Sequence, residues 1–258
     1  MKLISLVFLF LFLILAPAAS AEERIELPTR PGVTQPFYLT KPKGQPRASL
    51  ILFPGGFGTL EHYGPADLRR GNFLVRSRDL FVARGFTVAV MDVPSDERSL
   101  SDGFRLGAAH RSDIAAVIAY LRQAANAPVW LVGTSRGTLS AANAATLPAG
   151  GADGVVLTST LLRRAGKRGD GTIFDADPSR ITIPVLIVHN REDACPACPF
   201  ELAADLLQRL ARAPRKDLIA VAGGDPPISP PCRALSRHGY LGIEDQVVAA
   251  ISDWITAR

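Results

Sequence analysis

The sequence predicts an α/β protein in which a mostly parallel central sheet is flanked by helices on both faces. Two observations predict this fold class. From residue 48 to the end, short apolar runs that favour strands alternate with longer segments at helical spacing. The strand segments are continuously apolar, as expected of parallel strands buried on both faces. In such a sheet, functional residues lie in the loops that follow the carboxyl ends of strands.

The N-terminal stretch lies outside this pattern. Lys2 precedes an apolar run over residues 3–15, and small residues at 19–21 offer a cleavage site. We interpret residues 1–21 as a secretory signal peptide and expect residues 22–258 to form a single domain that is secreted or periplasmic. An uncleaved anchor is the alternative, but the apolar run falls short of a comfortable bilayer span.

Eight segments have the apolar, β-forming character of strands. They are residues 24–27, 35–40, 48–53, 86–91, 129–132, 154–158, 184–188 and 217–222. Pro28, Pro31 and Gly32 separate the first two, so these form a predicted hairpin. The remaining strands belong to the alternating α/β pattern.

Helical spacing or composition marks five segments. They are residues 72–84, 108–125, 136 onward, 200–211 and 242–256. Gly85 is well placed to end the first of them, and the third is rich in alanine, a strong helix former. Residues 92–107 and 159–182 have the irregular, polar character of loops.

The charge pattern argues against nucleic acid as a partner. The full chain carries a net charge of +5, but it has no Lys/Arg-rich block interleaved with aromatic residues. The basic cluster at residues 163–168 lies in a glycine-rich stretch and is expected to be a solvated loop. No later apolar run is long enough for stable membrane insertion. Nothing in the sequence predicts an oligomeric state.

The motif Gly133-Thr-Ser135-Arg-Gly137 falls where a buried strand meets a helix. A serine in so tight a turn adopts a strained backbone conformation, and the flanking glycines avoid collisions between the strand and the helix. The serine hydroxyl is thereby exposed above the end of the sheet. Ser135 is therefore the candidate nucleophile.

A serine nucleophile needs a base, and the chain has four histidines. His238 lies between the last strand and the last helix, at the expected edge of the sheet, so it is the favoured base. His110 begins a helix and is expected to be solvated or to cap it. His189 ends a strand and is expected to be a strand-end residue. The fourth, His62, lies in the loop that follows the strand at residues 48–53.

The orienting acid is expected after the strand at residues 184–188, where Glu192 and Asp193 are adjacent. Neighbouring residues in a turn point in different directions, so only one can hold the imidazole. We favour Asp193, because its shorter side chain gives a stiffer hydrogen bond and Pro196 fixes the loop beyond it. Glu192 is the alternative.

Backbone N–H groups are expected to stabilise the negative charge that develops on an acyl oxygen. One donor is Arg136, the residue after the nucleophile, at a helix N-terminus. The other is Gly56 or Phe57, in the glycine loop formed by residues 54–58. This loop lacks the spacing of a P-loop or of a dinucleotide site. No cofactor is predicted.

These features together resemble the α/β-hydrolase superfamily: the motif around Ser135, the upstream glycine loop, and Asp193 and His238 in the order Ser, Asp, His. The resemblance covers nearly all of the chain after the signal peptide. It implies an eight-stranded, mostly parallel sheet and hydrolysis through an acyl-enzyme. The chain has no long insertion between the strands at residues 154 and 184. In this respect it resembles small esterases or dienelactone-hydrolase-like members with a minimal lid. Dienelactone hydrolases usually carry cysteine where this chain has Ser135, which argues against a lactone-specific role.

The expected function is therefore that of an exported serine hydrolase, acting on a small-molecule carboxylic ester or related acyl compound. The alternative is a catalytically idle binding protein with the same fold. His62 and Tyr63 near the glycine loop, and Tyr240 beside His238, are candidates for lining the substrate cleft, although each could equally pack in the interior.

The chain has three cysteines, and an exported protein permits disulfides. If Asp193 and His238 meet, their loops are neighbours, and a Cys195–Cys232 disulfide would join them. Cys198–Cys232 and Cys195–Cys198 pairs are the alternatives. The Cys195-Pro-Ala-Cys198 stretch also fits a redox motif, although its place after a turn argues against that role. Three cysteines and a histidine could bind zinc, but no second ligand pair at regular spacing supports a metal site.

Overall fold

The computed structural model describes residues 21–60, 71–148, 151–164, 166 and 170–257. The predicted signal peptide, apart from its last residue, lies outside these residues, as do His62 and Tyr63.

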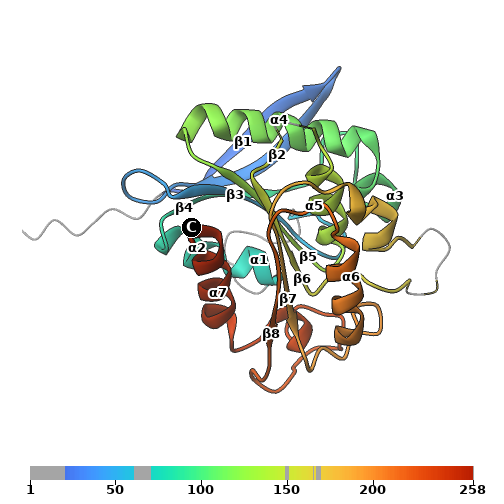
Figure 1. The fold of residues 1–258 in the computed structure, drawn as a ribbon. Coiled ribbons are helices and arrows are strands. Elements are labelled where there is room, and N and C mark those ends of the chain that lie inside the picture. Colours follow the sequence, from blue (N-terminus) through green and yellow to red (C-terminus); the bar gives the residue numbers. More distant parts are fainter. Residues whose placement is uncertain (1–20, 61–70, 149–150, 165, 167–169, 258) are drawn as a thin grey trace, which may run out of the picture.

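Eight strands form one sheet in the order β1-β2-β4-β3-β5-β6-β7-β8 (Figure 1). The strands are β1 (Glu23–Arg30), β2 (Val33–Thr40), β3 (Ala48–Phe53), β4 (Phe86–Met91), β5 (Val129–Thr134), β6 (Gly154–Thr158), β7 (Val185–Asn190) and β8 (Lys216–Val221). Strand β2 pairs antiparallel with both β1 and β4, and all other pairings are parallel. The predicted mostly parallel, eight-stranded sheet is confirmed.

Helices cover both faces of this sheet, as the sequence predicts (Figure 1). The α-helices are α1 (Phe73–Arg76), α2 (Arg78–Ala83), α3 (Asp102–Arg105), α4 (Ala108–Ala125), α5 (Gly137–Ala145), α6 (Ala203–Arg209) and α7 (Glu244–Thr256). Helices α4, α5 and α6 pack on one face, and α1, α2 and α7 pack on the other. Successive side chains of a strand point to opposite faces of the sheet. In β3, Ile51 therefore packs against the layer of α4, α5 and α6, and Leu50 packs against the layer of α1, α2 and α7.

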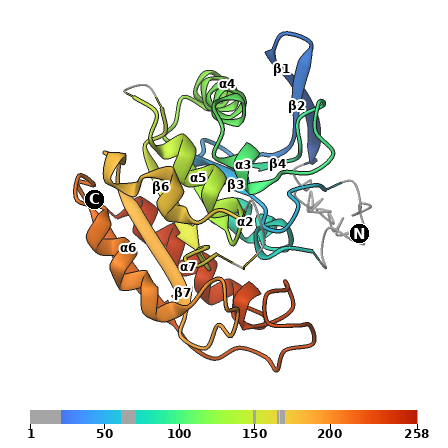
Figure 2. The ribbon, with the colours of Figure 1, turned by 90° about the vertical axis from the view of Figure 1, so that its right-hand side faces the viewer.

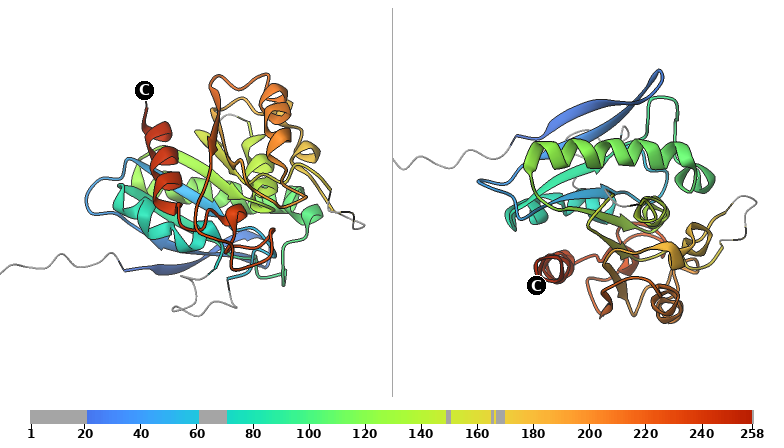
Figure 3. Two further views of the ribbon diagram at one scale, coloured as in Figure 1. Left: turned by 90° about the horizontal axis from the view of Figure 1, so that it is seen from below. Right: turned by 45° about the horizontal axis from the view of Figure 1, so that its top comes forward.

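The β1–β2 hairpin extends beyond the main body of the sheet, and the long helix α4 lies beside it (Figures 2 and 3). Arg30 in the hairpin joins the two, because its guanidinium lies 2.9 Å from Asp113 in α4. Because β3, β5, β6 and β7 pair in parallel, their carboxyl ends lie together at one edge of the sheet.

Two predicted elements differ in detail from the structure. The helix expected at residues 72–84 is divided at Ser77 into α1 and α2. Arg78 turns back and donates to the carbonyl oxygen of Val75 at 2.8 Å, at the point where the two helices meet. The loop expected at residues 92–107 contains α3, which begins because the Ser101 hydroxyl accepts a hydrogen bond from Phe104 N at 3.1 Å.

The connection between β6 and β7 contains little regular secondary structure. Among its described residues, only two 3-10 turns form, η2 (Ile173–Ala176) and η3 (Pro178–Arg180). Further 3-10 turns are η4 (Phe200–Leu202), which leads into α6, and η5 (Arg237–Gly239). The described part of the β6–β7 connection thus carries no α-helical insertion. For the residues that the structure describes, no helix combines the length and apolar character that crossing a bilayer requires.

Candidate active site

Ser135 occupies a sharp turn between β5 and α5. Its φ angle is +53°, in the left-handed region that non-glycine residues seldom adopt. The flanking glycines are sterically required. A Cβ atom on Gly133 would lie 2.5 Å from the Gly137 carbonyl oxygen, and one on Gly137 would lie 2.0 Å from the carbonyl oxygen of Phe53. The turn therefore needs both glycines, and it presents Ser135 at the end of the sheet.

His238 and Asp193 come together from the loops after β8 and β7. His238 Nδ1 lies 2.8 Å from Asp193 Oδ2, and both side chains are buried. The other carboxylate oxygen of Asp193 accepts a hydrogen bond from Cys195 N at 2.9 Å. On the other loop, the Ser236 hydroxyl accepts from His238 N at 3.2 Å. The Asp193 side chain and the His238 backbone are thus each held by a contact within their own loop.

Glu192, the alternative acid, points elsewhere. Its carboxylate forms an ion pair with Arg237 at 2.9 Å and accepts a hydrogen bond from Gly223 N at 3.2 Å. The structure therefore places Asp193, and not Glu192, against the imidazole of His238.

Tyr240 does not line the cleft, and this prediction is corrected by the structure. Its side chain is fully buried. The hydroxyl donates to the Val188 carbonyl oxygen at 2.8 Å and accepts from Ser159 N at 3.0 Å. Ser159 in turn donates from its hydroxyl to the carbonyl oxygen of His238 at 2.7 Å. The tyrosine thus anchors the loop of His238 to the ends of β6 and β7.

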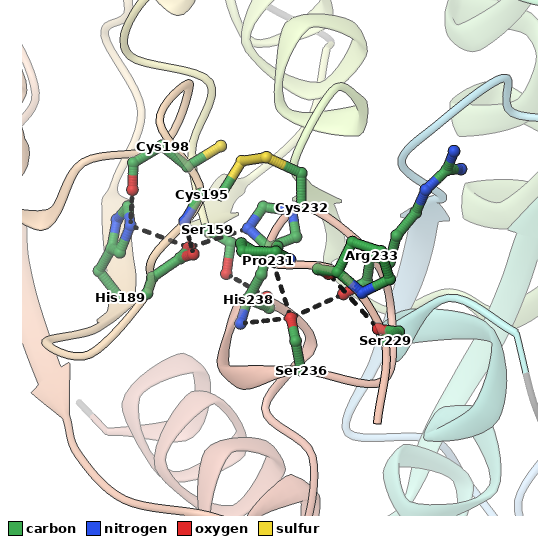
Figure 4. The surroundings of a disulfide bond; sticks show 12 residues. Ser159, His189, Cys195, Cys198, Ser229, Pro231, Cys232, Arg233, Ser236 and His238 are labelled. Carbon is green, nitrogen blue, oxygen red and sulfur yellow. Dashed lines mark hydrogen bonds and ion pairs between the residues drawn. A yellow bond between two sulfur atoms is a disulfide. The ribbon is translucent and has the colours of Figure 1, made fainter. Parts of the chain in front are cut away.

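Ser135 and His238 are not hydrogen-bonded to each other among the described residues. The thiol of Cys198 lies beside both of these side chains. Cys198 Sγ, Cys195 Sγ and a ring nitrogen of His238 all lie within 4.8 Å of one another (Figure 4). A thiol therefore stands next to the serine and the imidazole.

The protonation of His238 depends on Asp193. Burial by itself would lower the pKa of His238, but Cys198 and the hydrogen bond to Asp193 outweigh it and raise the pKa above the ordinary imidazole value. Burial raises the pKa of the Cys198 thiol. Burial would raise the pKa of Asp193, yet the ring of His189, 3.6 Å away, and the hydrogen bond from His238 lower it.

The predicted N–H donors border the space around Ser135. Gly56 and Phe57 lie on both of the cavities that meet at this serine, and Arg136 borders one of them. Within the described part of the chain, the backbone N–H groups of these three residues have no hydrogen-bond acceptor. They are available to a ligand at Ser135.

Arg105 supports the glycine loop from beneath, a role that sequence reasoning missed. The side chain is fully buried, and its Nη2 donates to the carbonyl oxygens of Pro54 at 3.2 Å and Gly56 at 3.3 Å. Its Nη1 donates to the Ser140 hydroxyl at 2.9 Å. Burial lowers the pKa of Arg105 to about 9, so the guanidinium is charged at neutral pH. A buried cation therefore fixes the carbonyl groups of the loop.

The Arg136 side chain is held by carboxylates. Its Nε lies 2.8 Å from Asp102 Oδ1, its Nη2 donates to Asp102 Oδ2 at 2.9 Å, and Asp170 lies 3.6 Å away. Asp102 also accepts from Gly171 N at 2.9 Å. The side chain is thus paired with carboxylates, and the backbone N–H of Arg136 is left without an acceptor among the described residues. The only sequence signal for α3, which carries Asp102, is the N-capping Ser101.

Two cavities meet at Ser135. The smaller has a volume of about 200 Å³ and the larger a volume of about 350 Å³, and both have polar and apolar walls. The apolar wall of the first is formed by Pro54, Leu60, Phe73 and Val75, and the second is bordered by Asp102, Arg136, Leu161 and Asp170. A bound molecule that reaches Ser135 can thus extend in two directions.

The disulfide joins Cys195 to Cys232, the pairing favoured from the sequence, and Cys198 is free. It links the loop of Asp193 to the loop of His238. Cys195, Cys198 and His238 lie close enough together to be considered as ligands of a metal ion. Because the Cys195 sulfur forms the disulfide, two potential ligands of this group, Cys198 and His238, remain while that bond is intact.

The other described histidines are buried. His189 lies with Nε2 at 2.8 Å from the Cys198 carbonyl oxygen. His110 is not solvated as expected: its Nε2 lies 2.9 Å from the Ser140 hydroxyl in the interior between α4 and α5. Burial, followed by the charges of Arg105 and Arg30, lowers the pKa of His110 to about 3, so it is neutral. Neither ring contacts Ser135.

No protein-family model and no curated protein sequence matches this chain. Solved structures do. An esterase from Pyrococcus furiosus is 13% identical, with 92% of each chain covered and a TM-score of 0.65. Est1E from Butyrivibrio proteoclasticus is 16% identical over 92% of this chain and 98% of that one, with a TM-score of 0.61. A lidless α/β serine hydrolase from Xanthomonas campestris is 14% identical over 95% and 99%, with a TM-score of 0.60. The chain has the α/β-hydrolase fold.

Proposed function

We propose that this chain is an exported serine hydrolase that cleaves a small carboxylic ester, or a related acyl bond, through an acyl-enzyme. The observation that carries the proposal is Ser135 at a left-handed turn beside the buried His238–Asp193 pair. Solved structures of the same fold support it, since one from Pyrococcus furiosus and one from Rhodothermus marinus are described as esterases and one Est1E structure contains ferulic acid. The predicted signal peptide and the disulfide support export, because disulfides persist in oxidising compartments.

In the proposed reaction, His238 accepts the proton of the Ser135 hydroxyl as its oxygen attacks the acyl carbon. Asp193 holds the imidazole through Nδ1 and stabilises its positive charge. The oxyanion receives hydrogen bonds from Arg136 N–H and from Gly56 or Phe57 N–H. His238 then protonates the leaving alcohol. Water, activated by the same imidazole, releases the acid and restores Ser135.

The two cavities at Ser135 fit the two halves of an ester. One half would enter the cavity beside Phe73, and the other would enter the cavity bordered by Arg136 and Asp170. The absence of a Ser135–His238 hydrogen bond among the described residues requires the serine hydroxyl to turn toward the imidazole when substrate binds, as is common in unliganded sites. The same observation favours the second candidate, an idle binding protein.

Labelling with a fluorophosphonate probe tests the assignment. We expect the folded protein to be labelled at Ser135 and Ser135→Ala to be unlabelled, whereas Ser112→Ala, at an exposed helix position, retains the label. A panel of p-nitrophenyl esters with increasing acyl length would then define the substrate range. Label that persists in Ser135→Ala would refute the nucleophile. A folded wild-type protein with neither label nor turnover would establish the binding protein instead.

The pH dependence of hydrolysis should show the raised pKa of His238. The base must be neutral, so kcat/KM for an uncharged ester is expected to rise with pH and to level off above the pKa of His238 in the free enzyme. The midpoint should lie above about 6.5, the value of an unperturbed imidazole. In Asp193→Asn the anion is lost, and the midpoint of the remaining activity should fall. A wild-type midpoint at or below the unperturbed value would contradict this account.

Arg105→Met should lower kcat by about a hundredfold, comparable with the loss of one oxyanion donor, and change KM much less. The substitution removes the donors that hold Pro54 O and Gly56 O, so the loop no longer fixes its N–H groups. Ser140→Ala is the matched control, because it removes the other partner of the guanidinium without touching the loop. Steady-state kinetics, with the melting temperature of each variant, would check this. An equal loss of kcat in Ser140→Ala would argue against a role through the loop.

A further inference from the structure

The three cysteines form a compact cluster with unequal access to solvent. Cys195 and Cys232 form the disulfide, in which Cys195 is buried and Cys232 is exposed. Cys198 is a free thiol and is fully buried. Its Sγ lies within 4.8 Å of Cys195 Sγ, and Figure 4 shows it directed toward the disulfide. A thiol is thus held next to a disulfide sulfur, with the leaving sulfur on the surface.

The backbone already suits a bond between Cys195 and Cys198. The two residues are the ends of a turn with Pro196 at its second position, closed by a hydrogen bond from Cys198 N to the Cys195 carbonyl oxygen at 2.9 Å. The Cα atoms at the ends of such a turn are less than about 7 Å apart. Disulfides need a Cα separation of about 4.4–6.8 Å. The turn can therefore accept this disulfide with little movement of the chain.

We propose that Cys195, Cys198 and Cys232 form a thiol–disulfide exchange site. The Cys198 thiolate attacks Cys195 Sγ, a Cys198–Cys195 bond forms, and the Cys195–Cys232 bond breaks. The electron pair of the broken bond leaves on Cys232, which takes up a proton at the surface. The proton of Cys198 passes to His238, whose ring nitrogen lies within 4.8 Å of Cys198 Sγ. The step is an isomerisation, so it needs no oxidant or reductant.

The exchange would unlink the two loops that meet at His238. In the original pairing, the disulfide ties the loop of Asp193 to the loop of His238. After exchange, the new bond lies within the 195–198 turn, and Cys232 becomes an exposed thiol open to mixed disulfides with small thiols. The inference does not require Ser135, so it stands or falls separately from hydrolysis.

Trapping with iodoacetamide tests the exchange in the folded, unreduced full chain. Tryptic cleavage separates residues 192–209, which contain Cys195 and Cys198, from residues 217–233, which contain Cys232. The resting isomer yields these two peptides joined. The exchanged isomer yields the 217–233 peptide alkylated at Cys232 and the 192–209 peptide with an internal disulfide. We expect the second pair to accumulate with time, and the joined pair to decline.

Cys198→Ser is the matched control, because it retains the disulfide and removes the attacking thiol. Its alkylation at Cys232 should be lower than in the wild type by about tenfold or more. Ser112→Ala, at an exposed position of α4, should exchange as the wild type does. If Cys198→Ser fails to fold, the peptide map of the wild type still decides. Label confined to Cys198 in joined peptides, or no label on folded protein, would overturn the proposal.

Discussion

Asp193→Asn is expected to lower kcat/KM by about four orders of magnitude, the loss typical of an orienting aspartate in a serine hydrolase. Asparagine keeps the shape of the side chain but offers an amide in place of the carboxylate. The imidazole of His238 would then turn to its other tautomer, with Nδ1 as the acceptor and no basic nitrogen toward Ser135. Steady-state kinetics on the best ester of the panel would measure the effect.

Glu192→Gln is the matched control for this substitution. The residue is adjacent, carries the same charge and lies in the same turn, but its carboxylate pairs with Arg237. An exposed pair of this kind contributes little, so kcat/KM should remain within about threefold of the wild type. Equal losses in the two variants would show that the loop as a whole, and not the Asp193 contact, supports the reaction.

Gly137→Ala is expected to abolish folding or to lower the free energy of unfolding by more than about 4 kcal/mol. The new methyl group would lie 2.0 Å from the Phe53 carbonyl oxygen, whereas carbon and oxygen normally approach to about 3.3 Å. Relief would require moving α5 away from β3, in a region where every residue of both elements is buried. Soluble yield and denaturant unfolding would measure the loss.

Gly103→Ala provides the comparison. Gly103 is exposed in α3, and a Cβ atom added to it meets nothing within 4 Å. Alanine favours helices, so the free energy of unfolding should change by no more than about 1 kcal/mol and in the stabilising direction. A Gly137→Ala protein as stable as this control would mean that the turn at Ser135 tolerates a side chain, and that its glycines are not a steric requirement.

The features predicted correctly are those whose cause is local in the sequence. The apolar character of the strands is enough to place them in a buried parallel sheet. The turn at Ser135 follows from two glycines within five residues, because the clashes they avoid occur between a strand and the helix that directly follows it. The disulfide was inferred from one assumption, that the loops carrying Asp193 and His238 meet.

The features missed depend on partners far away in the chain. His110 is buried because Ser140 lies against it, and Arg105 is tied to the glycine loop and to the same serine. Tyr240 faces inward because it bridges Val188 and a residue at the end of another strand. In each case the residue type alone suits solvent or a cleft equally well. Which polar groups such a residue can hydrogen-bond to is decided only when the sheet and helices are assembled.

The disulfide also closes a ring in the chain, since Cys195 and Cys232 are 37 residues apart. This ring contains α6 and β8, the strand at the outer edge of the sheet. Edge strands open more readily than central ones during native-state fluctuations. Opening of β8 would otherwise carry the segment that bears His238 away from the segment that bears Asp193. With the ring closed, their separation stays bounded, so the outer edge can undergo hydrogen exchange while the two segments remain neighbours.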